Sequence, residues 1–184
     1  MKEATITYRI ATTDDAQAIQ EIYRYYVEHT FITFDFDVPS VEEFTHRIAH
    51  TLERYPYLVA VKDNQVIGYA YAGIYKNRAA YDWSVEISIY LDNKLQHHGV
   101  GSRLYQKLEH YLKEQHVTNI YSCVSYPNDA SIHFHEKWGF EQIAHFHRCG
   151  FKLGKWRDMV WLEKFIALHP DEVKPFIPFQ ELQE

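Results

Sequence analysis

Residues 85–112 read VEISIYLDNKLQHHGVGSRLYQKLEHYL, and this stretch decides the fold of the chain. Its first part alternates, with apolar side chains at residues 85, 87, 89 and 91 and Glu86 among the residues between them. This period of two is typical of a pleated β-strand. Its last part spaces Leu104, Leu108 and Leu112 at helical intervals, which predicts an amphipathic helix.

Two glycines, Gly99 and Gly101, stand between the strand and the helix. Glycine permits a tight turn, and the first amides of a helix are unpaired and lie at the positive end of its dipole. The stretch therefore predicts a cradle for a phosphate-bearing ligand. No lysine follows Gly101 and a third glycine is missing, which argues against an ATP-binding loop and a dinucleotide fingerprint. The alternative is an ordinary strand-to-helix turn.

Composition narrows the class of protein. The 184 residues suffice for one domain, and a formal net charge of −6 argues against a nucleic-acid partner. Cys123 and Cys149 lack the spacing of a metal site or of a secreted disulfide framework, so we expect reduced core thiols and no metal. A signal peptide and a membrane-spanning segment are not apparent, which predicts a soluble cytoplasmic protein.

The predicted element order is β-α-α-β-β-β-α-β-α-β-β. It indicates an α/β (α+β) domain with one mixed, mostly antiparallel sheet flanked by helices. We assign residues 1–168 to this domain and residues 169–184 to an irregular, proline-containing tail. The apolar residues of this tail indicate that it packs against another part of the protein, at a place the sequence does not specify. The expected strands are residues 5–10, 57–61, 66–74, 83–91, 120–125, 140–151 and 156–165, and the expected helices follow Thr12 or Thr13, Ser40, Gly99 and Asn128.

The glycine turn and the element order together resemble the GNAT superfamily of N-acetyltransferases, in which Q-x-x-G-x-G is the pyrophosphate loop of acetyl-coenzyme A. Residues 128–140, NDASIHFHEKWGF, resemble the second signature of the superfamily. His135 stands where many members have tyrosine, and one family with histidine there is phosphinothricin acetyltransferase. Matching fragments cover most of the chain: ERYPYLVA from Glu53, G-x-A-Y-A-G from Gly68, K-x-R-x-A-Y-D-W from Lys76, V-E-x-S-x-Y from Val85, Q-x-x-G-x-G-S-x-L-Y from Gln96, PND from Pro127, H-E-x-W-G-F from His135 and G-x-W-x-D from Gly154.

The resemblance implies transfer of acetyl from acetyl-CoA, as co-substrate, to the α-amino group of a phosphinothricin- or methionine sulfoximine-like amino acid. The amine would attack directly in a ternary complex, in a homodimeric enzyme. Two alternatives remain open. One is an acetyltransferase for another amine, such as a polyamine or a protein N-terminus, and the other is a non-catalytic acyl-CoA-binding module.

Two side chains are the candidate catalytic residues. Glu86 lies opposite the apolar series of its strand, where a carboxylate can take a proton from the amine, and the resemblance places the general base there. The alternative is a glutamate on an exposed strand face. His135 lies in the last turn of a short helix, whose negative end favours the charged imidazole. The resemblance makes it catalytic, as acid or as base, whereas the alternative is dipole compensation alone.

The resemblance also implies contacts to the co-substrate. The thioester oxygen and the pantetheine arm would lie along the central strand, the pyrophosphate would lie on the glycine turn, and Asn128 would contact the co-substrate further along. Helix capping is the alternative role of Asn128, and both roles can hold together. The expected contact residues are Ile89, Tyr90, Leu91, Gln96, His97, His98, Gly99, Val100, Gly101, Ser102 and Asn128.

The amine substrate is expected against the aromatic loop and the polar stretch before the central strand. Arg78 can hold a carboxylate or phosphinate through two parallel hydrogen bonds, and Lys76 adds positive charge. Tyr81 and Tyr90 offer hydroxyl groups, and Phe34 would form a wall of the pocket. The alternatives are a solvated basic loop and core tyrosines.

Overall fold

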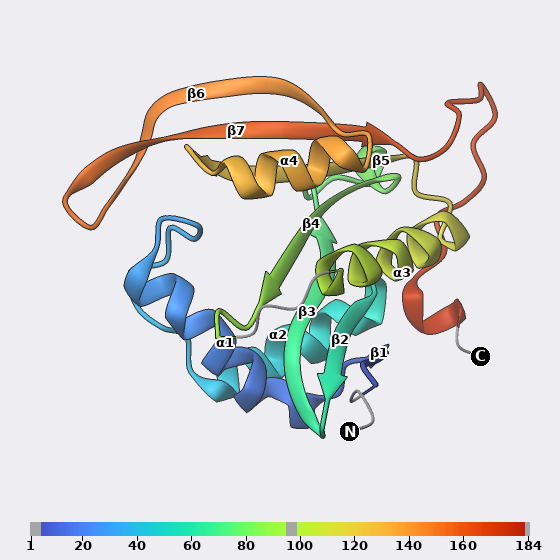
Figure 1. Cartoon of the computed structure of the whole chain (residues 1–184). Coiled ribbons are helices and arrows are strands. Elements are labelled where there is room, and N and C mark those ends of the chain that lie inside the picture. The colour runs from blue at the N-terminus through green and yellow to red at the C-terminus, as the bar shows by residue number, and fades with distance from the viewer. Residues whose placement is uncertain (1–4, 95–98, 183–184) are drawn as a thin grey trace.

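The computed structural model describes residues 5–94 and 99–182, and in this part of the chain seven strands form one sheet. Four α-helices accompany it (Figure 1), and short 3-10 turns cover Thr13–Asp15, Ala79–Tyr81 and Phe179–Leu182. The strands are β1 (Thr7–Ile10), β2 (Tyr57–Lys62), β3 (Gln65–Ile74), β4 (Ser84–Leu91), β5 (Asn119–Tyr126), β6 (Glu141–Lys152) and β7 (Lys155–Phe165). The helices are α1 (Ala16–His29), α2 (Val41–Arg54), α3 (Val100–Glu114) and α4 (Asp129–Lys137).

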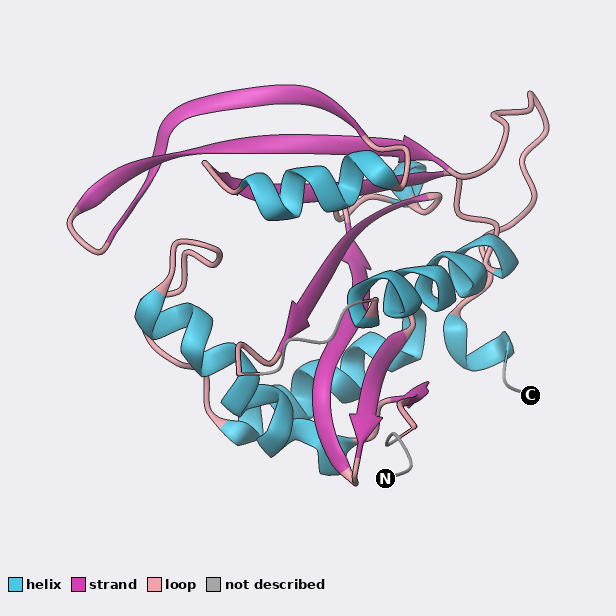
Figure 2. Ribbon diagram, in the orientation of Figure 1, coloured by secondary structure: helices cyan, strands magenta, loops and turns pink. Residues whose placement is uncertain are grey.

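The strand order is β1-β2-β3-β4-β5-β7-β6, and only the β4–β5 pair is parallel. The predicted element order and the mostly antiparallel sheet are therefore confirmed. The β6–β7 hairpin runs past α4 toward the loop that follows α1 (Figure 2). Among the described residues, no helix has the length and apolarity needed to cross a lipid bilayer.

Short-range signals set where the elements begin. The Ser40 hydroxyl accepts a hydrogen bond from the Glu43 amide at 3.1 Å, which caps α2 as its sequence predicts. The Asn128 side chain accepts one from the Ser131 amide at 3.3 Å and caps α4. Asp63 and Asn64 take positive φ angles in the tight turn between β2 and β3, a conformation that these residue types tolerate.

Strand alternation divides the core between the two faces of the sheet. Val85 and Ile87 of β4 are buried on the same side as Leu104 and Leu108 of α3. On the opposite side, Tyr69 of β3 belongs to a second cluster with the inner residues of α1 and α2. Burial of apolar area drives both contacts, so α3 covers one face and α1 with α2 covers the other.

The sheet divides between β4 and β5. Parallel pairing joins Ser84 to Asn119, Val85 to Ile120 and Glu86 to Tyr121, and it ends there. β4 nevertheless continues to Leu91, and β5 continues to Tyr126. The two strands therefore separate beyond Glu86, and their facing edges have backbone groups that no strand in the described part of the chain uses.

The C-terminal tail packs against the domain. Phe179 is only 1% exposed and its ring meets Tyr111 of α3 edge to face. The buried Gln115 side chain donates a hydrogen bond to the Ile177 carbonyl at 2.8 Å. One sequence expectation is wrong at the surface of the sheet: Cys149 is exposed rather than a core thiol, whereas Cys123 is partly buried.

Candidate active site

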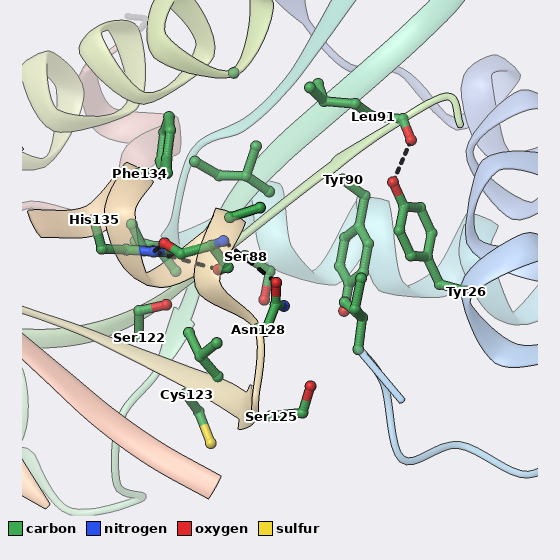
Figure 3. Close-up of a pocket in the computed structure, with 17 residues that line it drawn as sticks. Tyr26, Ser88, Tyr90, Leu91, Ser122, Cys123, Ser125, Asn128, Phe134 and His135 are labelled. Atoms are coloured by element: carbon green, nitrogen blue, oxygen red, sulfur yellow. Dashed lines mark hydrogen bonds between the residues drawn. The ribbon is translucent and has the colours of Figure 1, made fainter. Parts of the chain in front are cut away.

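A cavity of about 330 Å³ lies where β4 and β5 separate (Figure 3). Both strands contribute to it, together with the end of α1, the loop that follows, the start of α3, and α4. Its lining consists of Tyr26, Ile32, Ile87, Ser88, Ile89, Tyr90, Leu91, Gly101, Ser122, Cys123, Val124, Ser125, Asn128, Ala130, Ser131, Phe134 and His135.

The cavity takes side chains from both faces of the sheet. Ile87 and Val124 belong to the core on the α3 side. Because side chains alternate along a strand, Ser88 and Cys123 point to the α1 side. The cavity therefore passes through the gap between the strands, and two molecules can approach each other in it from opposite faces of the sheet.

The glycine turn forms the start of α3. Gly99 has φ +92°, a left-handed conformation that favours glycine, and its carbonyl accepts the first helical hydrogen bond from Arg103 at 3.0 Å. The amides of Val100, Gly101 and Ser102 precede that bond, so the helix offers them no partner. Gly101 lines the cavity, whereas Val100 is buried in the core. The expected contact residues Gln96, His97 and His98 lie outside the described residues.

The part of β4 that no longer pairs with β5 faces the cavity through Ile89, Tyr90 and Leu91, which were the predicted co-substrate contacts on this strand. The Tyr26 hydroxyl donates a hydrogen bond of 2.6 Å to the Leu91 carbonyl. The Tyr90 ring packs edge to face on Tyr26 and Tyr23. These contacts tie the end of β4 to α1, in the segment where β4 pairs with β3 but no longer with β5.

Glu86 is the last residue of β4 that pairs with β5, at the point where these two strands begin to separate. Its side chain lies on the α1 side, and burial raises the pKa of its carboxyl group while the Lys76 charge opposes that rise. Burial also raises the pKa of the Cys123 thiol to about 12, with a further contribution from the Glu86 carboxylate. Glu86 therefore lies beside the wall of the cavity without being one of its lining residues.

His135 lies in the last turn of α4 and is only 6% exposed. Its Nδ1 lies 2.7 Å from the Ser131 carbonyl oxygen. A carbonyl can only accept, so Nδ1 carries a proton, and in the neutral ring Nε2 has a free lone pair. Burial lowers the pKa of the imidazole. The expected preference for the charged form is therefore wrong, because desolvation outweighs the hydrogen bond to the Ser131 carbonyl, which favours the imidazolium.

The other residues expected at the amine substrate lie apart from the lining. Lys76 has its Nζ over the rings of Tyr75 and Trp161, at 5.2 and 5.8 Å from their centroids. Arg78 and Tyr81 are exposed in the loop that precedes β4, on the N-terminal side of Ser84. Phe34 lies beside the backbone of Gly150 in β6, and Ile32 lines the cavity in its place.

Sequence reasoning missed the contribution of β5. Ser122 and Ser125 are buried polar residues, and both line the cavity with Cys123 between them. Small polar residues in a buried strand were the available signal, because a buried strand is otherwise apolar. Tyr26 is spaced like the buried residues of α1, and nothing in this spacing distinguishes a core tyrosine from one that lines a cavity.

Comparisons with known proteins agree with this geometry. Residues 8–161 match the acetyltransferase (GNAT) domain family. A phosphinothricin N-acetyltransferase of Streptomyces viridochromogenes is 33% identical over 92% of this chain and 94% of its own length. An L-methionine sulfoximine/L-methionine sulfone acetyltransferase of Salmonella typhimurium is 30% identical over 89% of this chain and 96% of its own.

Solved structures of acetyltransferases share the fold of this chain. A GNAT superfamily phosphinothricin acetyltransferase from Sinorhizobium meliloti, in complex with acetyl-CoA, superposes with a TM-score of 0.86 at 31% identity, over 95% of this chain and 98% of its own. A ribosomal-protein-alanine N-acetyltransferase from Brucella melitensis superposes with a TM-score of 0.82 at 29% identity, over 87% of this chain and 99% of its own.

Proposed function

The chain belongs to the GNAT family of acetyltransferases, and from this premise we propose that it acetylates the α-amino group of a small amino-acid analogue. Phosphinothricin and methionine sulfoximine are the substrate type, since relatives of similar length act on them. Acetyl-CoA is the donor, and the amine attacks it directly in a ternary complex. The observation that carries this proposal is the cavity through the separated strands, which both molecules can enter from opposite faces.

The α3 face suits the donor. The amides of Val100, Gly101 and Ser102 would hold its diphosphate, because they are unpaired and lie at the positive end of α3. The edge of β4 that faces β5 at residues 89–91 would align the pantetheine arm and offer an N–H to the oxyanion. A preorganised donor of this kind is typically worth about 3 kcal/mol in the transition state.

The α1 face suits the amine substrate. Lys76 lies close enough to Glu86 for its charge to affect the pKa of the carboxyl group. A substrate carboxylate or phosphinate held by Lys76 and Arg78 would therefore bring its amine toward Glu86. Tyr81 completes the proposed contacts of this substrate, Ile32 forms the wall that was expected of Phe34, and Tyr90 lines the cavity between the two molecules.

The reaction removes two protons from the substrate nitrogen. An ammonium group loses the first before it can attack, and the second leaves as the amide forms and the thiolate departs. Glu86 accepts the first, directly or through water, and its raised pKa makes it a stronger base than an ordinary carboxylate. The neutral His135 accepts the second on Nε2, and the thiolate takes a proton from solution.

The pKa directions favour the base role of His135. An acid role needs the imidazolium form together with an ionised Glu86. A raised Glu86 pKa and a lowered His135 pKa narrow the pH range in which those two forms coexist. Two proton acceptors, in contrast, are both in their active form at any pH above both pKa values.

An assay of thiol release from acetyl-CoA tests the function. We expect turnover with phosphinothricin or methionine sulfoximine, and much lower kcat/KM with a polyamine or a peptide that begins with alanine. A preference for either of those acceptors would contradict the proposal and identify a different acetyltransferase. Tight binding of acetyl-CoA without turnover of any amine would identify a binding module.

Lys152, in the β6–β7 hairpin, holds the loop beside the proposed amine site. It is 2% exposed, and its Nζ donates hydrogen bonds to the carbonyl oxygens of Thr33 at 2.8 Å and Tyr26 at 3.4 Å. Lys152→Met would leave both carbonyls without that donor, at a cost of about 1–3 kcal/mol. We expect the KM for the amine to rise about tenfold, with little change in the KM for acetyl-CoA.

Lys155→Met is the matched control, because Lys155 is exposed in the same hairpin. Equal effects of the two substitutions on the amine KM would contradict this positioning role, and so would an effect of Lys152→Met on acetyl-CoA alone.

We also propose that the protein is a cytoplasmic homodimer. The hairpin presents large apolar side chains to solvent, including Phe146, Phe151 and Trp156, and a partner subunit would cover them. Light scattering on the purified protein tests the assembly, and a monomer at micromolar concentration would contradict it.

A further inference from the structure

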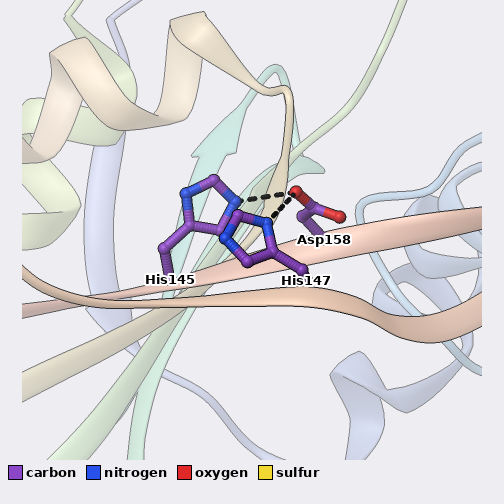
Figure 4. Close-up of side chains that lie close together, drawn as sticks. All are labelled: His145, His147 and Asp158. Carbon is purple, nitrogen blue, oxygen red and sulfur yellow. Dashed lines mark hydrogen bonds and ion pairs between the residues drawn. The ribbon is translucent and has the colours of Figure 1, made fainter.

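Three side chains that can bind a metal converge on the β6–β7 hairpin, separate from the residues proposed for acetyl transfer (Figure 4). His145 and His147 come from β6, and Asp158 comes from β7. The Oδ2 atom of Asp158 lies 2.8 Å from Nε2 of His145 and 3.0 Å from Nδ1 of His147. One candidate ligand atom from each residue lies within 4.8 Å of the others.

The backbone builds this arrangement. His145 and His147 are two residues apart on one strand, so both side chains can reach the same face of the hairpin. The β6–β7 register is then irregular between Phe146 and Gly150. Within this irregular segment Arg148 has φ +48°, and its amide donates a hydrogen bond of 2.8 Å to Oδ1 of Asp158. The amide fixes one carboxylate oxygen and leaves the other directed at both imidazoles.

We propose that His145, His147 and Asp158 bind one divalent transition-metal ion, with zinc as the preferred ion. Two imidazole nitrogens and one carboxylate oxygen are a common ligand set for zinc, with a remaining position open to water. Binding replaces the two hydrogen bonds to Oδ2, and each neutral imidazole keeps its proton on the ring nitrogen that does not face the ion. The His147 side chain is 76% exposed, so the ion can reach the site from solvent.

The position of the site indicates a structural role. The Tyr126 ring packs on His145 with 4.8 Å between ring centroids, and Asn128, two residues further along, caps α4 and lines the cavity. An ion held by both strands of the hairpin would therefore strengthen the support of the turn before α4. It would not touch the reacting groups, because none of the three ligands lines the cavity.

The competing interpretation is an aspartate that only accepts hydrogen bonds from two histidines. A measurement of metal binding distinguishes the two interpretations. The experiment uses the full chain without an affinity tag, stripped with a chelator. Zinc binding is measured by calorimetry, and the ligand set is measured by the visible absorption of the cobalt-loaded protein. Neither readout depends on turnover, so the result is independent of the proposed acetyltransferase substrate.

We expect one ion per chain, a cobalt spectrum of nitrogen and oxygen ligands, and a higher melting temperature with zinc. His147→Ala and Asp158→Asn should each weaken zinc binding by at least about tenfold and remove the zinc-dependent rise in melting temperature. His110→Ala is the control, since His110 is an exposed histidine on α3. Circular dichroism verifies that each variant is folded.

Three results would overturn the proposal. The first is wild-type zinc affinity in both folded ligand variants. The second is an equal loss of affinity in His110→Ala, which would indicate nonspecific binding to surface histidines. The third is a thiolate-to-cobalt charge-transfer band, which would assign the ion to Cys123 or Cys149 instead.

Discussion

Replacing Glu86 with glutamine is expected to lower kcat by about 10²–10⁴-fold, the usual contribution of a positioned general base. The substitution keeps the size of the side chain at the last position where β4 pairs with β5, so the pairing of these two strands should persist. The amide cannot accept the proton of the substrate ammonium. The measurement is steady-state thiol release with saturating acetyl-CoA, together with the affinity of the variant for acetyl-CoA, which should stay unchanged.

Glu141→Gln is the matched control, because Glu141 is an exposed glutamate at the first position of β6. Glu86→Gln activity within a few-fold of the wild type would exclude Glu86 as the base. Partial recovery of the Glu86→Gln rate at high pH, where more amine is already neutral, would support the assigned role.

The second large effect is expected for His135→Asn, with a loss of kcat of about 10²-fold or more. The asparagine amide can still donate to the Ser131 carbonyl in place of Nδ1, so the bond of 2.7 Å inside α4 has a substitute. What disappears is the Nε2 lone pair. His133→Asn is the control, since His133 is exposed on the same helix.

The pH profile distinguishes the two possible roles of His135. Burial lowers its pKa from the ordinary value of 6.5, so the neutral ring dominates at neutral pH. If His135 accepts a proton, kcat falls as the pH falls through that lowered pKa, and the wild-type profile is flat above it. If it donates a proton, kcat falls instead as the pH rises through the same pKa. A profile of the second kind would contradict the base role.

Features that depend on neighbouring residues could be predicted from the sequence. The cap of α2 by Ser40, the cap of α4 by Asn128 and the glycine start of α3 all follow from contacts within a few residues. The alternation of β4 identified Glu86 as the polar side chain on the central strand. Local chemistry and strand period therefore gave the order of the elements, and with it the fold class.

The rest depends on pairing between distant parts of the chain. No local pattern reveals that β4 and β5 pair only as far as Glu86 and Tyr121, yet this separation creates the cavity and exposes Ser122 and Cys123 to it. The lowered pKa of His135 also follows from burial that the helical pattern alone could not show. Contacts between residues far apart in the sequence determine both the extent of the β4–β5 pairing and the burial of His135.

The parallel pairing that ends at Glu86 has a mechanical consequence. Strands β1–β4 and strands β5–β7 are two blocks, joined within the sheet by a seam that is three residue pairs long. A thioester arm lying along residues 89–91 would act as a surrogate strand and supply the hydrogen bonds that the seam lacks. If acetyl-CoA binds as proposed, it would thereby stiffen the joint between the two blocks.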